Sequence, residues 1–430
     1  MKIELNSKNF KYISDNTNEL DESTAFFCTK QNEIYLKEAK EKASAIITPK
    51  VLETIFDIKD IQIVGITGTN GKTTTAAAIY SFLIDLGESV ALQGTRGFFI
   101  NDKRIKEKSL TTPPLLETIH NLYLAKESGC RYFIMEVSSH AIAQDRIENL
   151  NFSLKVYTNL TQDHLDYHKS FEEYKRVKSQ FFQDESKKLI NKDAKSIDFN
   201  IKNSFTYALD APSTFNITAF SLNDGISAIV RNLKDESNFH SPMQGLFNVY
   251  NLLAAISSVK LISDHSLEEI CSVVGNFAGV SGRMEVVSYS PLIIVDFAHT
   301  PDGMQQVLDS MKDKEISLVF GAGGDRDRKK RPQMGRVANR FAKKIYLTSD
   351  NPRSEDPMDI IMDIYDAIDD KSKVKVASKR EDAIRFAVNE LEDDEILMIL
   401  GKGDEEYQEI DGKKIPFDDR EIVRKILQKS

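Results

Sequence analysis

The sequence predicts an α/β protein built from three domains, with a mainly parallel, doubly wound sheet in the central one. The chain has 430 residues, which is more than one ordinary hydrophobic core accommodates. Short apolar runs alternate with segments of helical spacing, a pattern typical of doubly wound sheets that bind ligands at the carboxyl ends of their strands. The alternation restarts near Gly282-Arg-Met-Glu285, so we expect domains at residues 1–57, 58–283 and 284–430.

Each expected domain has its own series of elements. The first is a small α/β unit, because the apolar runs Ala25–Phe27 and Ala45–Ile47 are separated by polar segments. In the central domain we expect the strands Ile61–Ile66, Arg131–Val137 and Lys155–Leu160, and a helix at Ala76–Leu86 that ends at Gly87. In the C-terminal α/β domain we expect the strands Leu292–Asp296, Ser317–Phe320, Lys344–Thr348 and Ile396–Leu400.

Composition limits the class of protein. The chain is 41% hydrophobic and 29% charged, and no run approaches the roughly 18 apolar residues of a membrane span. The first seventeen residues, Met1–Thr17, have no apolar core for a secretion signal, so we expect a cytoplasmic protein without a membrane span. The three cysteines have no metal-like spacing, and we interpret them as reduced. A net charge of −9 argues against a nucleic-acid partner.

A phosphate-binding loop is expected at Thr67-Gly-Thr-Asn-Gly-Lys-Thr73, between the first central strand and its helix. Glycines let backbone N–H groups approach phosphates, and the helix N-terminus adds its positive dipole end. Lys72 would reach the outer phosphates, and the Thr73 hydroxyl would bind Mg²⁺. The alternative is a glycine-rich turn without a ligand, which the strand–loop–helix context disfavours.

Polar residues follow other predicted strands. Glu136 ends an apolar strand, where a carboxylate would serve as an oxygen ligand for Mg²⁺ or would simply begin a surface loop. The segment Thr161–His168 contains two acids and two histidines just after a strand. Four of the seven histidines lie after predicted strands, and this clustering favours a site: His140, His164, His168 and His299.

Lys178 lies on an apolar helical stripe. The stripe consists of residues at helical spacing, Phe171, Tyr174, Lys178, Phe181 and Phe182. A lysine in this setting is either a buried functional group or a snorkelling side chain whose ammonium stays in water. The sequence leaves both interpretations open.

Eight motifs now occur in an order that resembles a known family. They are GTNGKT, MEVSSH, NLTQDHLDYH, FNVYNLLAA, GRME, DFAHTPDG, GDRD and SDNPR. The resemblance covers most of the chain, from about Gly65 to Gln408. The chain resembles the Mur ligases of peptidoglycan synthesis, most closely those that add the third residue of the peptide. The resemblance implies an N-terminal domain for the UDP end of the substrate, a central P-loop ATPase domain and a C-terminal Rossmann-like domain. We also expect a monomer, although the sequence itself does not define the oligomeric state.

The resemblance implies an ATP-dependent, amide-forming reaction. ATP would phosphorylate the terminal carboxylate of UDP-N-acetylmuramoyl-L-alanyl-D-glutamate, and an incoming amine would attack the acyl phosphate. Two anions meet in the first step, so two Mg²⁺ ions and lysine charge are expected there. Thr73 would hold one Mg²⁺, and Glu136 and His164 the second. Lys178 matches a lysine that reacts with CO₂ to become a carbamate (N6-carboxylysine), a change that desolvation of the amine favours.

The remaining site residues are also carried over from the resemblance. The expected catalytic residues are Lys72, Lys178, His164 and His299. The expected ATP-binding residues are Gly68, Thr69, Asn70, Gly71, Lys72, Thr73, Thr74, Asn248, Asn251, Arg283 and Asp296. The expected contacts to the UDP-muramoyl-dipeptide are Asn16, Thr17, Thr111, Thr112, Ser138, Gln144 and Arg146. Alternatively, Asn248 and Asn251 are helix-surface amides, Arg283 is a linker charge and Thr111–Pro114 is merely a turn.

The motif Asp350-Asn-Pro-Arg353 resembles that of family members that add meso-diaminopimelate, whose second carboxylate would meet an arginine. The alternative for Arg353 is a surface arginine paired with Glu355 or Asp356. The expected diaminopimelate-binding residues are Arg326, Asp350, Asn351, Pro352, Arg353, Gly401 and Glu405. Other functions left open are the same ligase adding L-lysine, a folylpolyglutamate-type ligase and a nucleotide-dependent switch.

The sequence departs from the family pattern in three places. Asp404 stands where the family usually has a histidine, and Leu110 stands where an asparagine often precedes the two threonines. The family's Asp-Ser-Arg motif for the uridine is missing, and Ser14-Asp-Asn-Thr17 is the nearest candidate. The uridine contacts are therefore defined least by the sequence.

Overall fold

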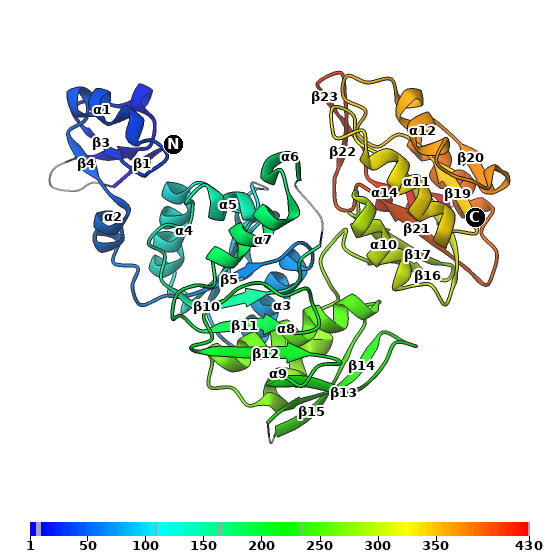
Figure 1. The fold of residues 1–430 in the computed structure, drawn as a ribbon, viewed down its shortest axis with the longest axis horizontal. Helices are drawn as coiled ribbons and strands as arrows, with labels where there is room; N and C mark the ends of the chain where they lie inside the picture. The colour runs from blue at the N-terminus through cyan, green and yellow to red at the C-terminus, as the bar shows by residue number, and fades with distance from the viewer. Residues whose placement is uncertain (6–9, 108–109, 162–164, 234, 429–430) are drawn as a thin grey trace. The chain divides into compact units, whose positions relative to one another are not determined.

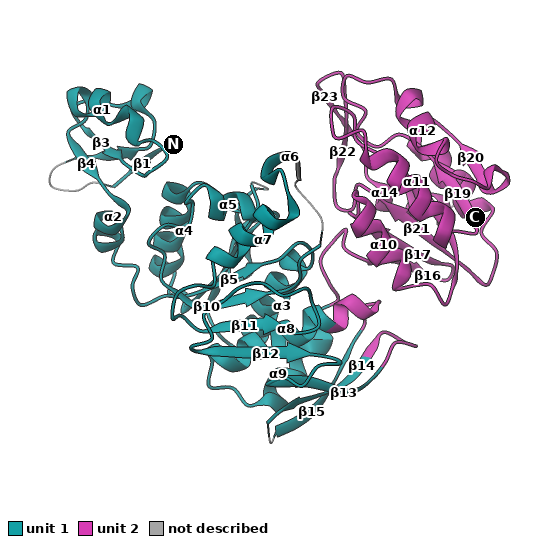
Figure 2. Cartoon of the chain, viewed as in Figure 1, with its two compact units in different colours: residues 1–220, 227–241, 250–277 teal, residues 221–226, 242–249, 278–430 magenta. Residues whose placement is uncertain are grey.

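β-Sheets of four, eleven, six and two strands organise the chain in the computed structural model, which describes residues 1–5, 10–107, 110–161, 165–233 and 235–428 (Figure 1). A small N-terminal sheet, a large parallel-rich central sheet and a C-terminal sheet confirm the predicted α/β fold. The chain divides into two compact units (Figure 2). Unit 1 comprises Met1–Phe220, Ser227–Ser241 and Tyr250–Phe277, and unit 2 comprises Ser221–Ile226, Pro242–Val249 and Ala278–Ser430. The finer division at residues 57 and 283 stays a prediction.

The N-terminal sheet has the order β1-β2-β3-β4, in which β1 is antiparallel to β2 and the remaining neighbours are parallel. Its elements are β1 (Lys2–Glu4), β2 (Tyr12–Ser14), β3 (Thr24–Phe27), α1 (Leu36–Lys42), β4 (Ala45–Ile47) and α2 (Pro49–Phe56). Proline occupies the first turn of α2, where its missing N–H costs nothing. Asp57 ends this helix in the left-handed conformation.

The central sheet has the order β15-β14-β13-β12-β11-β10-β5-β9-β6-β7-β8. Neighbours from β13 to β6 are parallel, and β7 and β8 continue it as antiparallel strands. The strands are β5 (Gln62–Thr67), β6 (Val90–Gly94), β7 (Gly97–Ile100), β8 (Lys103–Lys106), β9 (Tyr132–Glu136), β10 (Phe152–Tyr157), β11 (Lys188–Asn191), β12 (Ser204–Ala208), β13 (Phe215–Ser221), β14 (Ile226–Asn232) and β15 (Asp235–Ser241). The helices are α3 (Lys72–Asp85), α4 (Leu115–Glu127), α5 (Ser139–Ala143), α6 (Leu165–His168), α7 (Phe171–Gln180), α8 (Leu246–Ile262) and α9 (Leu267–Val273).

Two elements of the central domain, both beside the phosphate-binding loop, were predicted with wrong boundaries. Helix α3 begins at Lys72 rather than Ala76, because Gly71 takes a positive φ of 83° and directs the chain into the helix. Strand β10 runs from Phe152 to Tyr157 rather than from Lys155 to Leu160. The strand stops before Thr158, whose hydroxyl donates to the carbonyl oxygen of Asn70 in the loop at 2.6 Å.

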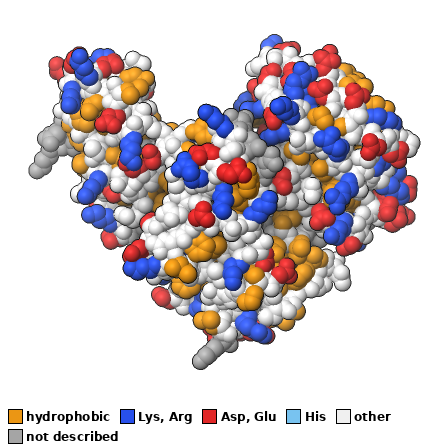
Figure 3. All heavy atoms as spheres, viewed as in Figure 1, with side chains coloured by type: hydrophobic (Ala, Val, Ile, Leu, Met, Phe, Trp, Pro, Cys, Tyr) orange, Lys and Arg blue, Asp and Glu red, His pale blue; other side chains and the backbone are white. Residues whose placement is uncertain are grey.

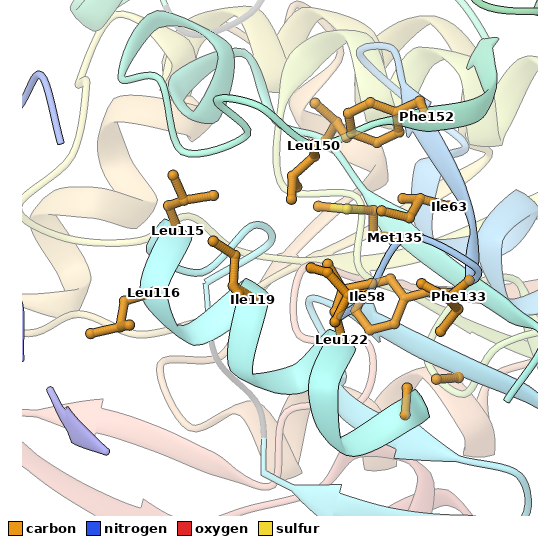
Figure 4. Packing of buried hydrophobic residues seen from close by; sticks show 14 of the residues in the cluster. Ile58, Ile63, Leu115, Leu116, Ile119, Leu122, Phe133, Met135, Leu150 and Phe152 are labelled. Carbon is orange, nitrogen blue, oxygen red and sulfur yellow. The ribbon is translucent and has the colours of Figure 1, made fainter. Parts of the chain in front are cut away.

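The central core is formed where α4 packs on the sheet. In Figure 4, Leu115, Ile119 and Leu122 of α4 lie beside Phe133 and Met135 of β9. All five side chains are at most 4% exposed. Burying an apolar side chain of this size contributes about 1.5–3 kcal/mol, so this layer fixes α4 on the sheet. The segment that leads into α4, residues 110–114, is thereby held at the carboxyl end of β9.

The C-terminal sheet has the order β16-β17-β21-β18-β19-β20, and its neighbours from β17 to β20 are parallel. Its predicted strands are confirmed within two residues. The strands of unit 2 are β16 (Glu285–Tyr289), β17 (Leu292–Asp296), β18 (Glu315–Phe320), β19 (Lys344–Leu347), β20 (Val374–Val376), β21 (Glu395–Leu400), β22 (Tyr407–Ile410) and β23 (Lys413–Pro416). Its helices include α10 (Pro301–Asp309), α11 (Lys330–Phe341), α12 (Pro357–Tyr365), α13 (Arg380–Asn389) and α14 (Asp419–Leu427). Polar segments follow β17, β21, β18 and β19 at one edge.

Basic and acidic side chains are interspersed on the face shown in Figure 3. The net charge is −9, and the expectation that the protein has no nucleic-acid partner stays a prediction. Within the described part of the chain, every helix is too short or too polar to cross a membrane.

Candidate functional site

The phosphate-binding loop is shaped by two glycines. A Cβ atom on Gly68 would lie 1.8 Å from Thr158 Oγ1, and one on Gly71 would lie 2.4 Å from Asn251 Oδ1. Gly71 also has a φ of 83°, which side chains disfavour. The loop therefore packs so closely on its surroundings that only glycine fits at either position. This close packing presents the backbone N–H groups of the following turn at the start of α3, the arrangement that binds phosphates.

Lys72 is the first residue of α3 and folds back over the loop. Its Nζ donates to the carbonyl oxygens of Gly68 and Thr69, both at 2.9 Å. These two carbonyl groups are neutral and do not cancel the positive charge of the ammonium, which is partly in contact with solvent. Lys72 is thus placed where the phosphates of a nucleotide would gain a cation.

Asn159 and Thr158 hold the loop from the neighbouring strand. Asn159 donates to the carbonyl oxygen of Asn70 at 3.1 Å, and its Oδ1 accepts from the N–H of Asn70 at 2.9 Å. Asn159 also accepts from the N–H of Thr69 through its carbonyl oxygen at 2.9 Å. Asn159 begins the motif NLTQDHLDYH, but neither residue was expected in the site, because Thr-Asn after a strand has no signature of its own.

Glu136 connects the loop to a second segment. Its Oε2 accepts from the Thr73 hydroxyl at 2.8 Å, and its Oε1 accepts from the N–H of Thr95 at 2.8 Å. Thr95 in turn shares a hydrogen bond of 3.1 Å with the Thr111 hydroxyl. Glu136 is 2% exposed and lies against Gly94, where a Cβ would approach its Oε1 to 2.2 Å. The alternative of a surface acid is therefore wrong, and Thr95 is a further site residue that the sequence analysis did not identify.

The oxygen atoms around Glu136 suit a hard cation. A threonine hydroxyl and a carboxylate are the ligand types that Mg²⁺ prefers, and Thr73 and Glu136 already lie in direct contact. Within the ranges that the structure describes, clusters of three or more His, Cys, Asp or Glu side chains that could hold a metal are absent. His164, the other expected ligand, lies outside the described residues.

Five of the seven expected contacts to the UDP-muramoyl-dipeptide lie close together at the carboxyl end of β9: Thr111, Thr112, Ser138, Gln144 and Arg146. The Thr112 hydroxyl donates to the carbonyl oxygen of Glu136 at 3.0 Å and accepts from the N–H of Ser138 at 2.9 Å. Arg146 donates to the carbonyl oxygen of Thr112 at 2.9 Å and to Gln144 Oε1 at 2.5 Å. These bonds give Thr111–Pro114 a fixed position beside Glu136, so the segment is more than a turn.

The N-terminal sheet reaches the same segment. Gln31 donates to the carbonyl oxygen of Gln144, and Lys30 pairs with Glu148 at 3.2 Å. Asn16 instead caps a short 3₁₀ helix that starts at Thr17, accepting from the N–H of Asn18 at 3.0 Å. Gln144 therefore contacts the loop that follows β3 of the N-terminal sheet. Asn16 and Thr17 instead form the start of a short 3₁₀ helix, which is a structural role.

Lys178 is 1% exposed, so the snorkelling interpretation is wrong. Its Nζ donates to the carbonyl oxygen of Gly68 at 2.9 Å and to Thr67 Oγ1 at 3.3 Å, and lies 4.9 Å from the centre of the Tyr174 ring. The Tyr174 hydroxyl shares a hydrogen bond of 3.1 Å with Thr69. Helix α7 therefore places a buried amine directly under the phosphate-binding loop.

His140 and His168, two of the clustered histidines, lie beside the turn that follows β9. His168 Nε2 shares a hydrogen bond of 2.9 Å with the hydroxyl of Ser139, next to Ser138. The rings of His140 and His168 are 5.6 Å apart. The structure thus brings His140 and His168 together, and their membership of a functional site stays a prediction.

Helix α8 carries both expected adenine-side amides. Asn251 lies against the loop, with its Oδ1 accepting from the Thr75 hydroxyl at 3.4 Å. Asn248 donates to the carbonyl oxygen of Gln244 at 2.8 Å. The two side chains are 6% and 1% exposed, so they are not surface amides.

In unit 2, Asp296 ends β17 and is held by two backbone groups. It accepts from the N–H groups of Met284 and Ala298 at 2.8 and 2.7 Å. Burial raises the pKa of Asp296, and the nearby charge of Arg283 opposes that rise. The Arg283 guanidinium lies 4.4 Å from the centre of the Phe297 ring, and His299 Nδ1 is 2.9 Å from the carbonyl oxygen of Phe297. These three expected nucleotide contacts thus form one group.

Arg353 follows β19 in the left-handed conformation, with a φ of 54°. Its Nε donates to Glu409 at 2.9 Å and its Nη1 to the carbonyl oxygen of Gly324 at 2.8 Å. The proposed pairing with Glu355 or Asp356 is therefore wrong. A Cβ on Gly323 would lie 3.0 Å from Arg353 Nη1 and 3.6 Å from Arg326 Cγ, so both expected carboxylate-binding arginines flank one glycine.

The other residues expected to contact diaminopimelate lie in the two segments that follow β19 and β21. Asn351 donates to Glu405 at 2.9 Å, and Gly401 has a φ of 116° and would place a Cβ 2.3 Å from Asp350 Oδ2. Pro352 packs against Gly324, where a Cβ would lie 1.9 Å from its carbonyl oxygen. The buried Lys402 was missed, because a lysine between two glycines reads as a loop residue.

The fold, the residues around the phosphate-binding loop in unit 1 and the residues at the edge of the sheet in unit 2 indicate one class of protein. Comparison with known proteins identifies this class. The Mur ligase middle domain matches residues 66–259, and the Mur ligase glutamate ligase domain matches residues 282–403. The chain belongs to the Mur ligase family.

Curated relatives with high sequence identity show which ligases within the family the chain resembles. A UDP-N-acetylmuramoyl-L-alanyl-D-glutamate–2,6-diaminopimelate ligase of Wolinella succinogenes is 52% identical over 428 residues, covering 99% of this chain and 98% of the relative. The enzyme of that name from Helicobacter pylori is 52% identical over 96% of this chain and 95% of its own. A solved structure of a ligase of that name matches with a TM-score of 0.72 at 29% identity, covering 99% of this chain and 97% of its own. A Mycobacterium tuberculosis folylpolyglutamate synthase shares the fold, with a TM-score of 0.66 at 15% identity over 82% of this chain and 91% of its own.

Proposed function

We propose that this chain is an ATP-dependent ligase that adds meso-2,6-diaminopimelate to the D-glutamate carboxylate of UDP-N-acetylmuramoyl-L-alanyl-D-glutamate. The observation that carries the proposal is the position of Glu136. It binds the Thr73 hydroxyl of the phosphate loop on one side and Thr95, beside Thr111, on the other. A phosphoryl donor on the loop and an acceptor on the threonine segment would meet at this carboxylate.

The D-glutamate carboxylate must be activated before it can form an amide with the incoming amine. A carboxylate oxygen is a poor leaving group, so the γ-phosphoryl group of ATP is transferred to it and the amine then displaces phosphate. The products are UDP-N-acetylmuramoyl-tripeptide, ADP and phosphate. Since two anions approach each other, positive charge must be concentrated there, and Lys72 supplies part of it from the start of α3.

Mg²⁺ would be held by the oxygens already described. Thr73 would bind one ion, and Glu136, with His164, a second one. The cation would shield the charge of the phosphates. His299 of unit 2 would contact the phosphates, and Asn248, Asn251, Arg283 and Asp296 the rest of the nucleotide.

Lys178 is proposed to carry the CO₂-derived carbamate. A neutral amine attacks CO₂ through its nitrogen lone pair, loses a proton and becomes an anion. The burial of Lys178 at 1% exposure favours the neutral amine, which is the reactive form. The carbamate signal in ¹³C NMR after addition of ¹³CO₂ is expected in the wild type and not in Lys178→Ala. We also expect Lys178→Ala to be inactive, not rescued by bicarbonate and partly rescued by short carboxylic acids. Full activity of this variant would contradict a role for the carbamate.

Two separate groups of residues are proposed to bind the two substrates. Thr111, Thr112, Ser138, Gln144 and Arg146 would hold the UDP-muramoyl-dipeptide. The planar guanidinium groups of Arg326 and Arg353 suit the carboxylates of diaminopimelate, with Asp350, Asn351, Pro352, Gly401 and Glu405 around them. We propose a monomer in the cytoplasm, where ATP and UDP-linked precursors occur, acting in peptidoglycan synthesis and thereby in cell shape and division.

Phosphate release tests this function. ATP and UDP-muramoyl-dipeptide are supplied with meso-diaminopimelate, with L-lysine or without an amine. We expect release only with diaminopimelate. Release with L-lysine alone would favour the lysine-adding alternative, release without an amine would favour a nucleotide-dependent switch, and activity on folate and glutamate would favour the folylpolyglutamate type.

A further inference from the structure

Lys402 carries a fully buried ammonium in unit 2, between residues that are proposed to bind the amino acid. The side chain is 0% exposed. Its Nζ donates to Glu405 Oε2 at 2.9 Å and to Asn351 Oδ1 at 3.1 Å. Burying an ammonium is costly unless good partners compensate it, and these two acceptors provide that compensation for Lys402.

Lys402 determines which way the amide of Asn351 faces. Asn351 Oδ1 accepts from Lys402 and from the N–H of Glu409 at 2.8 Å, and Nδ2 donates to Glu405 Oε2 at 2.9 Å. A flipped amide would place an NH₂ group against an ammonium and a backbone N–H. The orientation of Asn351 is therefore fixed by two donors, of which Lys402 carries the charge.

The hydrogen bond between Lys402 and Asn351 joins two loops at the carboxyl edge of the sheet. Lys402 follows β21 and Asn351 follows β19, and β18 lies between these strands in the sheet order. Lys402 and Asn351 both bond to Oε2 of Glu405, and no described residue donates a hydrogen bond to Oε1. One carboxylate oxygen of Glu405 is thus immobilised while the other stays available to an ammonium group.

We infer that Lys402 is a positioning residue for the amino-acid substrate. It cannot touch the substrate, because it is buried, and it acts by orienting Asn351 and the Oε1 atom of Glu405. This inference rests on the proposed function. Each hydrogen bond between charged groups contributes about 1.5–3 kcal/mol, so the loss of this orientation corresponds to about a 10- to 100-fold change in binding.

The test compares Lys402→Met with Lys344→Met in the full-length enzyme. Lys344 pairs with Glu395 at 3.2 Å at the amino end of β19, so its replacement removes a lysine pair from the opposite edge of the same sheet. We expect Lys402→Met to raise the KM for diaminopimelate about 10- to 100-fold, with the KM for ATP unchanged. Lys344→Met should leave both values unchanged. Equal increases in both KM values for Lys402→Met, or an unchanged KM for diaminopimelate, would overturn the inference.

A second variant separates orientation from general damage. In the Asn351→Ala background, Lys402→Met should add little further increase in the KM, because the residue through which it acts has gone. Full additivity would contradict the positioning role. If the wild type uses L-lysine instead of diaminopimelate, the proposed substrate is wrong and the same comparison is made with L-lysine. Turnover with neither amino acid would refute both the function and the inference.

Discussion

The buried pair of Arg380 and Asp419 gives the sharpest prediction about stability. Both side chains are 0% exposed, and the guanidinium meets the carboxylate through two bonds of 2.8 and 2.7 Å. Arg380 Nη2 also donates to the carbonyl oxygen of Leu400 at 2.9 Å, directly before Gly401. The pair therefore joins α13 and α14 to the end of β21, where the amino acid is proposed to bind.

Breaking this pair on one side leaves a buried charge without its partner. Such a loss costs about 3–5 kcal/mol, whereas replacing both partners by apolar groups is often nearly neutral. We expect Arg380→Met and Asp419→Leu each to destabilise unit 2 by about that amount, and the double variant to cost much less than the sum.

Hydrogen exchange is the suitable assay, because a chain with several units need not unfold in one step. Peptides from α13 and α14 should exchange about 10²- to 10³-fold faster or more in each single variant, since each 1.4 kcal/mol corresponds to a factor of ten. Peptides from α3 in unit 1 serve as the internal control and should exchange at the wild-type rate. Additive effects of the two substitutions would refute the account of a coupled buried pair.

Three other predictions follow from the site and its surroundings. Gly71→Ala should raise the KM for ATP about tenfold or more, because a left-handed residue costs about 1–2 kcal/mol and the new Cβ would lie 2.4 Å from Asn251 Oδ1. The matched control is Gly87→Ala, because Gly87 also has a positive φ, 82°, but its Cβ would meet no atom within 4 Å. This control variant should leave the KM for ATP unchanged. Thr73→Ala should raise the Mg²⁺ concentration needed for half-maximal activity, whereas Thr73→Ser, which keeps the hydroxyl, should not. The same Mg²⁺ requirement in Thr73→Ala and Thr73→Ser would argue against a metal-binding hydroxyl. The hydrogen bond from Arg331 lowers the pKa of Glu355 to about 2, so its stabilising contribution is present above the ordinary carboxyl pKa of about 4.3 and is lost as the pH falls toward 2. Acid titration followed by circular dichroism should show Glu355→Gln less stable than the wild type at neutral pH, with the difference vanishing near pH 2; a difference that persists at this pH would contradict the assignment.

The sequence predicted those features that depend on local pattern. Buried parallel strands are short apolar runs, so β5, β9 and β17 were recognisable from a few residues each. The apolar stripe of α7 marked Lys178 as either buried or snorkelling, and only the structure shows that it is buried. By contrast, β13 to β15 were not predicted, because many of their side chains face solvent and the strands contain serine, asparagine and threonine.

Contacts between distant segments could not be read from the sequence. Thr95 reaches Glu136 across the sheet, and Arg353 meets Glu409 rather than a neighbour in the chain. Small polar residues such as Thr95 have no periodicity that marks them, and the choice between two nearby acids depends on the backbone turn at Arg353. The role of Lys402 likewise depends on the order of strands, which places two loops together.

The central claim is that ATP activates the D-glutamate carboxylate by phosphorylation, and isotope transfer tests it most directly. UDP-muramoyl-dipeptide labelled with ¹⁸O in both oxygens of that carboxylate is incubated with the enzyme, ATP, Mg²⁺ and diaminopimelate. If an acyl phosphate forms, one labelled oxygen leaves with the phosphate and the other stays in the new amide. Mass spectrometry should therefore find one ¹⁸O atom in each phosphate released. Unlabelled phosphate from a reaction that still yields the tripeptide would contradict the account.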